Sequence, residues 1–110
     1  MSSRLDKMRD WEQAAALCGY SVEKMARYCK VSRRQLLRFF IEHFKKTPKH
    51  WLDEVRARAA EAELLRGELV KAASTGVQFK HPSNFTRFIK RVKGTTPREM
   101  ANRSNHVHDR

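Results

Sequence analysis

Side chains able to read DNA bases gather in two short stretches of the sequence. An arginine guanidinium can donate two hydrogen bonds to O6 and N7 of guanine, and an asparagine amide pairs similarly with adenine. A leucine can touch a thymine methyl group, and a lysine suits guanine or phosphate. The candidates are Arg33, Arg34, Leu37 and Arg38 in the first stretch, and Ser83, Asn84, Thr86, Arg87 and Lys90 in the second.

Both stretches have the apolar spacing of a helix. Ser32 with Gln35 forms the sequence pattern of a capping box at the start of the first helix, and Pro82 opens the second. The candidate base-reading side chains then point outward, on the side opposite the apolar residues. The inward residues are expected to be Leu36, Phe40 and Phe44 in the first helix, and Phe85, Ile89 and Val92 in the second.

The two stretches belong to an internal repeat. The segment from Val22 to Pro48 is echoed by the segment from Val70 to Pro97, with one extra residue in the turn of the second copy. Each copy reads as a short helix, a tight turn and a longer basic helix, which is the plan of a helix-turn-helix. A plain helical bundle with incidental self-similarity is the alternative, but the capping residues recur along with the apolar pattern.

A long helix is expected between the two copies. Thr47 and Pro48 give it an N-cap followed by proline, and it runs to about Arg66 before Gly67. It is about 28 Å long at ~1.5 Å per residue, close to the ~34 Å between successive major-groove faces of B-DNA. One monomer on DNA is therefore expected to place both basic helices in adjacent grooves. The face expected to be buried holds Trp51, Val55, Ala59, Ala62 and Leu65.

The remaining segments complete an all-α fold. A first helix is expected from the spacing of Leu5, Met8, Glu12 and Ala15–Ala16, with Trp11 at the edge of its apolar stripe, and Gly19 ends it. The prediction is two helix-turn-helix subdomains joined by a long central helix, with about seven helices in all. A short helix follows the cap Ser21, another covers about 69–77, and Thr96, Pro97 and Glu99 start the last one. The expected parts are the N-terminal helix and first helix-turn-helix at 1–46, a linker helix at 47–66, the second helix-turn-helix at 67–101 and a flexible tail at 102–110.

Charge and composition narrow the classes of partner. Lys and Arg number 24 against 12 Asp and Glu, giving a formal net charge of +12. Such a basic chain predicts an anionic partner, with nucleic acid first and an acidic membrane surface next. No apolar run approaches the length of a membrane span, and residues 1–10 do not resemble a signal peptide, so we expect a soluble, cytoplasmic protein.

No set of residues predicts catalysis or a bound metal. Cys18 and Cys29 lack metal-ligand spacing and are expected to be buried free thiols in a reducing compartment. His43, His50 and His81 are scattered, and the sequence has no glycine-rich phosphate loop. The sequence therefore predicts neither an enzyme nor a cofactor.

From about Trp11 to Met100 the sequence resembles the DNA-binding domain of the AraC/XylS family of bacterial regulators. The residues that carry the resemblance are the small apolar pairs Met25-Ala26 and Ala73-Ser74, then Gln78-Phe79, Phe85-Thr86-Arg87, Ile89-Lys90-Arg91 and Gly94-Thr95-Thr96-Pro97. The resemblance implies two helix-turn-helix units, asymmetric DNA sites and regulation that often activates through contact with RNA polymerase. Within the family, the sequence resembles the small stand-alone members.

The resemblance also implies a role for each candidate residue. Base reading falls on Arg34, Leu37 and Arg38 in the first unit and on Ser83, Asn84 and Arg87 in the second. Contacts nearer the DNA backbone fall on Arg33, Thr86 and Lys90.

The sequence departs from the family pattern at several positions. The usual turn glycine is Lys30 in the first unit and Gln78 in the second. A non-glycine residue at positive φ costs about 1 kcal/mol, so either the turns are altered or this cost is tolerated. Ser74 stands at an apolar core position, Met100 where an aromatic residue is common, and Pro82 where a polar base-reading side chain is expected.

Three functions remain open at this point. The first is sequence-specific DNA binding with transcriptional control, and the second is sequence-neutral nucleic-acid binding driven by phosphate contacts. The third is a protein-interaction module that contacts RNA polymerase or another regulator and hardly touches DNA.

Overall fold

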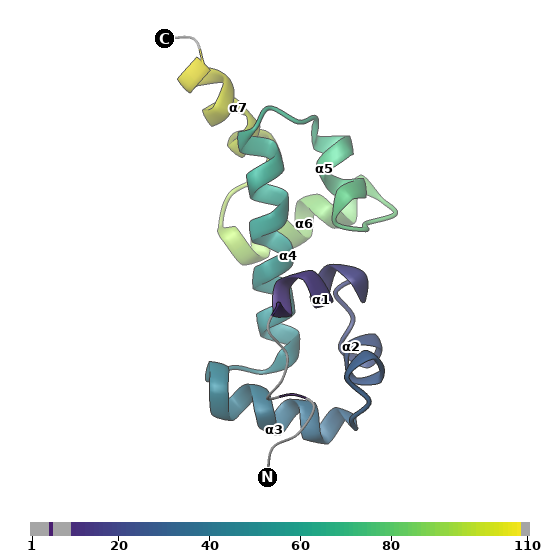
Figure 1. Cartoon of the computed structure of the whole chain (residues 1–110). Coiled ribbons are helices and arrows are strands. Elements are labelled where there is room, and N and C mark those ends of the chain that lie inside the picture. Colours follow the sequence, from purple (N-terminus) through teal and green to yellow (C-terminus); the bar gives the residue numbers. More distant parts are fainter. Residues whose placement is uncertain (1–4, 6–9, 109–110) are drawn as a thin grey trace. The chain divides into compact units, whose positions relative to one another are not determined.

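The computed structural model describes Leu5 and residues 10–108, with side chains through Arg103 (Figure 1). Within this part, seven α-helices and no strands occur, which confirms the predicted all-α fold with about seven helices. The chain divides into two compact units, Met1–Val55 and Arg56–Arg110, and one long helix crosses the boundary. The helices are α1 (Trp11–Leu17), α2 (Val22–Cys29), α3 (Arg33–Phe44), α4 (Pro48–Leu65), α5 (Val70–Gly76), α6 (Pro82–Lys93) and α7 (Pro97–His108).

Capping side chains start the helices at the predicted places. At α3, the Gln35 N–H donates to Ser32 Oγ at 3.1 Å and the Ser32 N–H donates to Gln35 Oε1 at 2.8 Å. At α7, Thr96 and Glu99 form the same reciprocal pair, at 3.2 Å and 2.8 Å. The hydroxyl oxygens of Ser21 and Thr47 likewise accept backbone N–H groups at the starts of α2 and α4.

Helix α1 begins later than the sequence predicts. The Asp10 carboxylate accepts the Gln13 N–H at 2.9 Å and caps a helix that starts at Trp11. Leu5 is buried but lies outside this helix, and Met8 lies outside the described residues. The expectation of a helix from Leu5 was wrong because the apolar spacing ran across a capping residue.

The core of the first unit is built around contacts between aromatic rings. Trp11 contacts Phe40 edge to face at a centroid distance of 5.1 Å, and Phe40 contacts Trp51 in the same way at 5.3 Å. Met25 and Leu36 are fully buried in the same cluster, so α2 and α3 pack against the start of α4. Trp11 is partly buried and packs against this cluster, at the edge of the core.

The second unit has a core of its own. Phe85 and Ile89 of α6 are fully buried, as is Ala73 of α5. Leu64 of α4 and Met100 of α7 are also buried in this unit. Helices α5, α6 and α7 all contact one another, and this packing holds α6 in place.

The buried face of α4 differs from the predicted stripe. Ala62 and Leu65 are exposed, although the sequence predicts both in the core. The helix serves a different core in each unit, so its buried residues do not continue one stripe of 3.6-residue period. The residues that it buries are Trp51, Leu52, Val55, Ala57, Ala60 and Leu64.

Helix α7 continues beyond the predicted start of the tail. The sequence predicts a tail from about Asn102, but the helix runs to His108. Its capped start and the buried side chain of Met100 fix the first turns, after which each added residue gains one backbone hydrogen bond. The lack of regularly spaced apolar residues after Asn102 therefore did not mark the end of this helix.

Candidate nucleic-acid interface

The turn between α2 and α3 keeps a left-handed residue at the position of the family glycine. Lys30 ends α2 with φ 59° and ψ 42°. Its N–H donates to the Arg27 carbonyl at 3.1 Å, and the Val31 N–H donates to the Ala26 carbonyl at 3.0 Å. Of the two possibilities left by the sequence, the structure shows the second: the turn is retained and its cost of about 1 kcal/mol is tolerated.

The turn between α5 and α6 repeats this geometry. Gln78 has φ 66°, and the Phe79 N–H donates to the Ser74 carbonyl at 3.0 Å. Ser74 itself is buried, at a position where the family pattern has an apolar residue. The second unit therefore presents its longer helix from the same kind of turn as the first.

Helix α3 exposes the face that the sequence predicts for DNA. Leu36 is 0% exposed and Leu37 is 43% exposed, so Leu37 does not extend the core. Arg33, Arg34 and Arg38 are exposed, and none forms an ion pair with a carboxylate in the described part of the chain. Phe44, predicted to face inward, is partly buried against the core.

Helix α6 presents a polar face in the same manner. Its buried residues are Phe85, Phe88 and Ile89, while Val92 is partly buried. Pro82 is the first residue of α6 and is exposed, so this position offers no side-chain donor. The exposed candidates are Ser83, Asn84, Thr86, Arg87 and Lys90.

Arg56, on α4, holds the turn that precedes α6. Its Nε donates to the Val77 carbonyl at 2.8 Å and its second guanidinium nitrogen donates to the Gln78 carbonyl at 3.0 Å. The guanidinium also stacks on Phe79, 3.7 Å from the ring centroid. The sequence analysis missed this positioning residue, and the only signal for it is a single charge between Val55 and Ala57.

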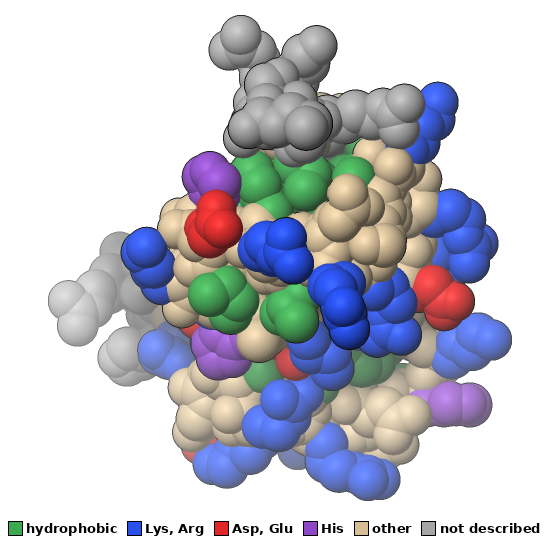
Figure 2. Space-filling view, turned by 90° about the horizontal axis from the view of Figure 1, so that it is seen from below, with side chains coloured by type: hydrophobic (Ala, Val, Ile, Leu, Met, Phe, Trp, Pro, Cys, Tyr) green, Lys and Arg blue, Asp and Glu red, His purple; other side chains and the backbone are tan. Residues whose placement is uncertain are grey.

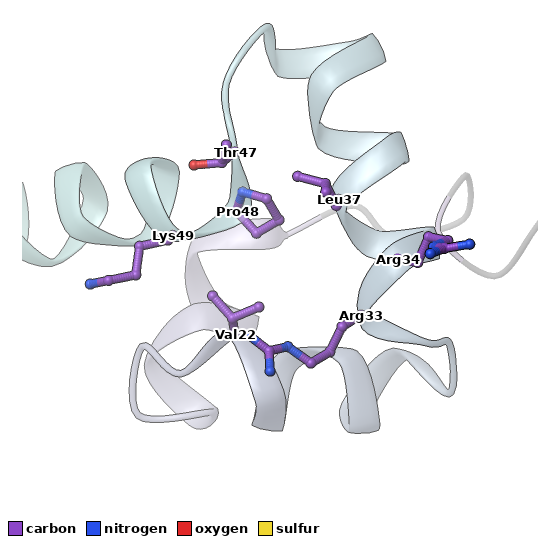
Figure 3. A pocket seen from close by; sticks show the side chains of 7 residues that line it. All are labelled: Val22, Arg33, Arg34, Leu37, Thr47, Pro48 and Lys49. Atoms are coloured by element: carbon purple, nitrogen blue, oxygen red, sulfur yellow. The ribbon is translucent and has the colours of Figure 1, made fainter.

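A hollow of about 290 Å³ lies beside the exposed face of α3, within the first unit (Figure 3). Three segments form it: the start of α2, the first half of α3 and the start of α4. Sequence analysis did not predict this feature, because it joins segments that are distant along the chain. The lining residues are Val22, Arg33, Arg34, Leu37, Thr47, Pro48 and Lys49.

The surface is strongly basic. Figure 2 shows a face with many Lys and Arg side chains and few Asp or Glu. Several carboxylates are neutralised by lysines: Glu54 lies 2.6 Å from Lys46 and Glu61 lies 3.0 Å from Lys93. These pairs do not involve the exposed arginines Arg33, Arg34, Arg38 and Arg87, whose positive charge attracts an anionic partner.

The cysteines and several possible metal ligands lie within the residues that the structure describes. Cys18 and Cys29 are buried free thiols, as predicted, and burial raises the pKa of each thiol. No group of three or more His, Cys, Asp or Glu side chains in this part of the chain is placed to hold a metal ion. Over the same residues, no helix has the length and apolar character that crossing a membrane requires.

Comparison with known proteins identifies the fold. A family model described as a helix-turn-helix domain matches residues 25–103. The structure is similar to that of a transcriptional regulator from Chromobacterium violaceum, described as containing an AraC-type DNA-binding domain. The TM-score is 0.68 and the identity 24%, over 83% of this chain and 88% of that one.

A second solved structure has the same fold. It is described as a probable AraC family transcriptional regulator from Rhodopseudomonas palustris CGA009, with a TM-score of 0.64 and 22% identity over 84% of this chain and 92% of that one. None of the curated proteins compared with the chain matches it. The AraC-type regulators are a family without enzymatic activity. With the family model covering most of its length and both turns in place, the chain belongs to the AraC-type helix-turn-helix family of DNA-binding transcription regulators.

Proposed function

We propose that this protein is a sequence-specific activator that inserts α3 and α6 into successive major grooves of one DNA duplex. One observation carries the proposal: residues at equivalent positions of the two repeats have the same burial. Leu36 and Phe85 are both fully buried, while Arg38 and Arg87 are both exposed on the opposite side. Each helix thus turns an arginine away from its core at the same point, as base reading in a major groove requires.

The remaining candidate residues have roles set by their chemistry. Arg34, Leu37, Ser83 and Asn84 are proposed to contact base edges together with the two arginines. Arg33, Thr86 and Lys90 are proposed to contact the DNA backbone. The protein acts as a monomer in the bacterial cytoplasm, without cofactor or catalytic step.

Selection from random duplexes, followed by footprinting, tests the proposal. Arg38→Ala and Arg87→Ala are each expected to weaken the selected site by roughly fivefold to a hundredfold, the range for a lost bidentate base contact. Binding to random duplex is expected to change far less. Arg66→Ala, which removes an exposed arginine directly after α4, serves as the matched control.

Two outcomes would overturn base reading. Equal losses on selected and random DNA would mean that both arginines bind phosphate only. A steep salt dependence without any preferred sequence would favour sequence-neutral binding, which the net charge of +12 also suits.

Binding in two grooves is tested by changing the distance between the two contacted segments of the DNA. Helix α4 has 18 residues and so a length of about 27 Å, which suits units that bind one duplex about a turn apart. Inserting half a helical turn between the two protected segments is expected to abolish joint binding. Unchanged affinity would show that one unit alone engages DNA.

Activation is tested by transcription in vitro with bacterial RNA polymerase. A promoter that carries the selected site upstream is expected to give more transcript when the protein is added. Less transcript would identify a repressor instead. An unchanged transcript level with an occupied site would contradict productive contact with the polymerase.

A further inference from the structure

The hollow beside α3 has an apolar base. Val22, Leu37 and Pro48 contribute hydrocarbon surface to it. In Figure 3, Leu37 points from α3 toward Pro48, and Arg33 reaches from the same helix toward Val22. A ligand with an apolar body would bury surface against these side chains that DNA phosphate could not cover.

The edge of the hollow is cationic. Arg33, Arg34 and Lys49 line it, and no acidic side chain is among its lining residues. Asp53 lies 3.3 Å from Lys49 and offsets part of that charge, which leaves the two arginines as the stronger attraction for an anion. Figure 3 shows Arg34 and Lys49 extending outward from different sides of the hollow.

We infer that this hollow binds a small amphipathic organic anion, with a flat apolar body on Val22, Leu37 and Pro48 and one carboxylate toward the cationic edge. The volume of about 290 Å³ is near the lower limit for small-molecule sites, which suits one or two fused rings.

The bound anion excludes DNA from the first unit. Arg33, Arg34 and Leu37 line the hollow and are also proposed DNA contacts, so one molecule cannot engage both at once. This regulatory part rests on the proposed function. By linkage, the anion weakens DNA binding by the same factor as DNA weakens anion binding.

Direct binding is measured first, on the full chain without DNA. Sodium 2-naphthoate is titrated against the ¹⁵N-labelled protein, and saturable shifts are expected at the amides of Val22, Leu37 and Lys49. The neutral alcohol 2-naphthalenemethanol is expected to bind several-fold more weakly because it lacks the charge. Equal binding of both compounds, or shifts spread over α5–α7, would overturn the site.

Two matched variants test the cationic edge. Lys49→Gln is expected to weaken 2-naphthoate binding about threefold, the loss for one solvent-exposed charge beside an anion. Lys71→Gln, which removes an exposed charge from α5 in the other unit, is expected to leave binding unchanged. The same loss in both variants would indicate general attraction to a basic protein and contradict a defined site.

Competition with DNA is measured last, with a fluorescein-labelled duplex of mixed sequence. When 2-naphthoate is present at its own Kd, the apparent Kd of the duplex is expected to double, with sodium chloride as the ionic-strength control. Anion binding without this shift would overturn the regulatory part. If the duplex does not bind at all, the proposed function fails, while the direct titration still decides whether the hollow is a ligand site.

Discussion

The guanidinium of Arg56 stacks on the ring of Phe79, 3.7 Å from its centroid, although the two residues lie on opposite sides of helix α5 in the sequence. The same group donates hydrogen bonds to the carbonyls of Val77 and Gln78. One side chain from α4 therefore fixes the turn that aims α6. The orientation of α6, which is proposed to read DNA, depends on a residue outside the second helix-turn-helix.

Replacing Arg56 tests this dependence. Arg56→Lys is expected to destabilise the turn by about 1–3 kcal/mol, because an ammonium group cannot satisfy two carbonyls and stack on a ring at once. Native-state hydrogen exchange of the amides between Val77 and Phe85 measures the effect. Arg66→Lys, at an exposed position, is the control and should leave exchange as it is. Exchange that is equally unaffected in both variants would mean that Arg56 does not hold the turn.

The left-handed turn residues give a second prediction. Lys30→Gly and Gln78→Gly are each expected to raise the free energy of unfolding by roughly 0.5–1 kcal/mol, since glycine adopts positive φ without strain. Lys24→Gly, inside α2, is expected to lower it by a similar amount. Thermal denaturation measures all three. A loss of stability in the two turn variants would show that the side chains of Lys30 and Gln78 outweigh the backbone strain.

Two glycines are expected to respond oppositely to alanine. A Cβ on Gly76 would lie 2.7 Å from the Glu63 carboxylate, which is the movable end of a long side chain. Gly76→Ala is therefore expected to stabilise α5 by about 0.5–1 kcal/mol. Gly94 has open space but a φ of 76°, so Gly94→Ala is expected to cost about 1 kcal/mol. Denaturant unfolding measures the stability of both variants. A less stable Gly76→Ala variant would mean that the Glu63 side chain cannot move away from the new Cβ.

The capping box of α7 makes stability depend on acid pH. The Thr96 N–H and the hydroxyl groups of Thr95 and Thr96 donate to Glu99, which lowers the pKa of that carboxyl to about 2 from 4.5. Because the folded pKa is depressed, the stabilisation is complete above about pH 5 and is lost as the pH falls toward 2. The advantage of the native protein over Glu99→Gln should shrink through this range.

A ¹³C titration of the Glu99 carboxyl checks this directly. The midpoint is expected near pH 2. An ordinary midpoint at Glu99 would show that the capping box does not form in solution.

The sequence predicted those parts of the fold that depend on local chemistry. The face of α3 followed from Leu36 and Phe40 because an amphipathic helix in one core has a single buried stripe. The face of α4 did not, since its two halves meet different cores and Leu52, Ala57 and Ala60 are buried outside the predicted stripe. The spacing of apolar residues therefore predicts the buried face of a helix only where the whole helix packs against a single core.

Features formed by residues far apart in the sequence could not be predicted from the sequence. The retained turns at Lys30 and Gln78 depend on a cost of about 1 kcal/mol that the surrounding packing can absorb. The contact of Arg56 with Val77 crosses 21 positions of sequence, and the hollow needs α2, α3 and α4 together. The exposed candidate residues were predicted because each lies opposite its own helix's core, while their contacts with DNA stay a prediction.

The aromatic cluster has a practical consequence for spectroscopy. Both tryptophans, Trp11 and Trp51, and both tyrosines, Tyr20 and Tyr28, lie in the first unit, and residues 56–110 contain neither type. Intrinsic fluorescence and absorbance at long ultraviolet wavelengths therefore come from one half of the protein alone. A tryptophan emission trace follows the melting of that half, and its comparison with far-ultraviolet circular dichroism shows whether the halves unfold together.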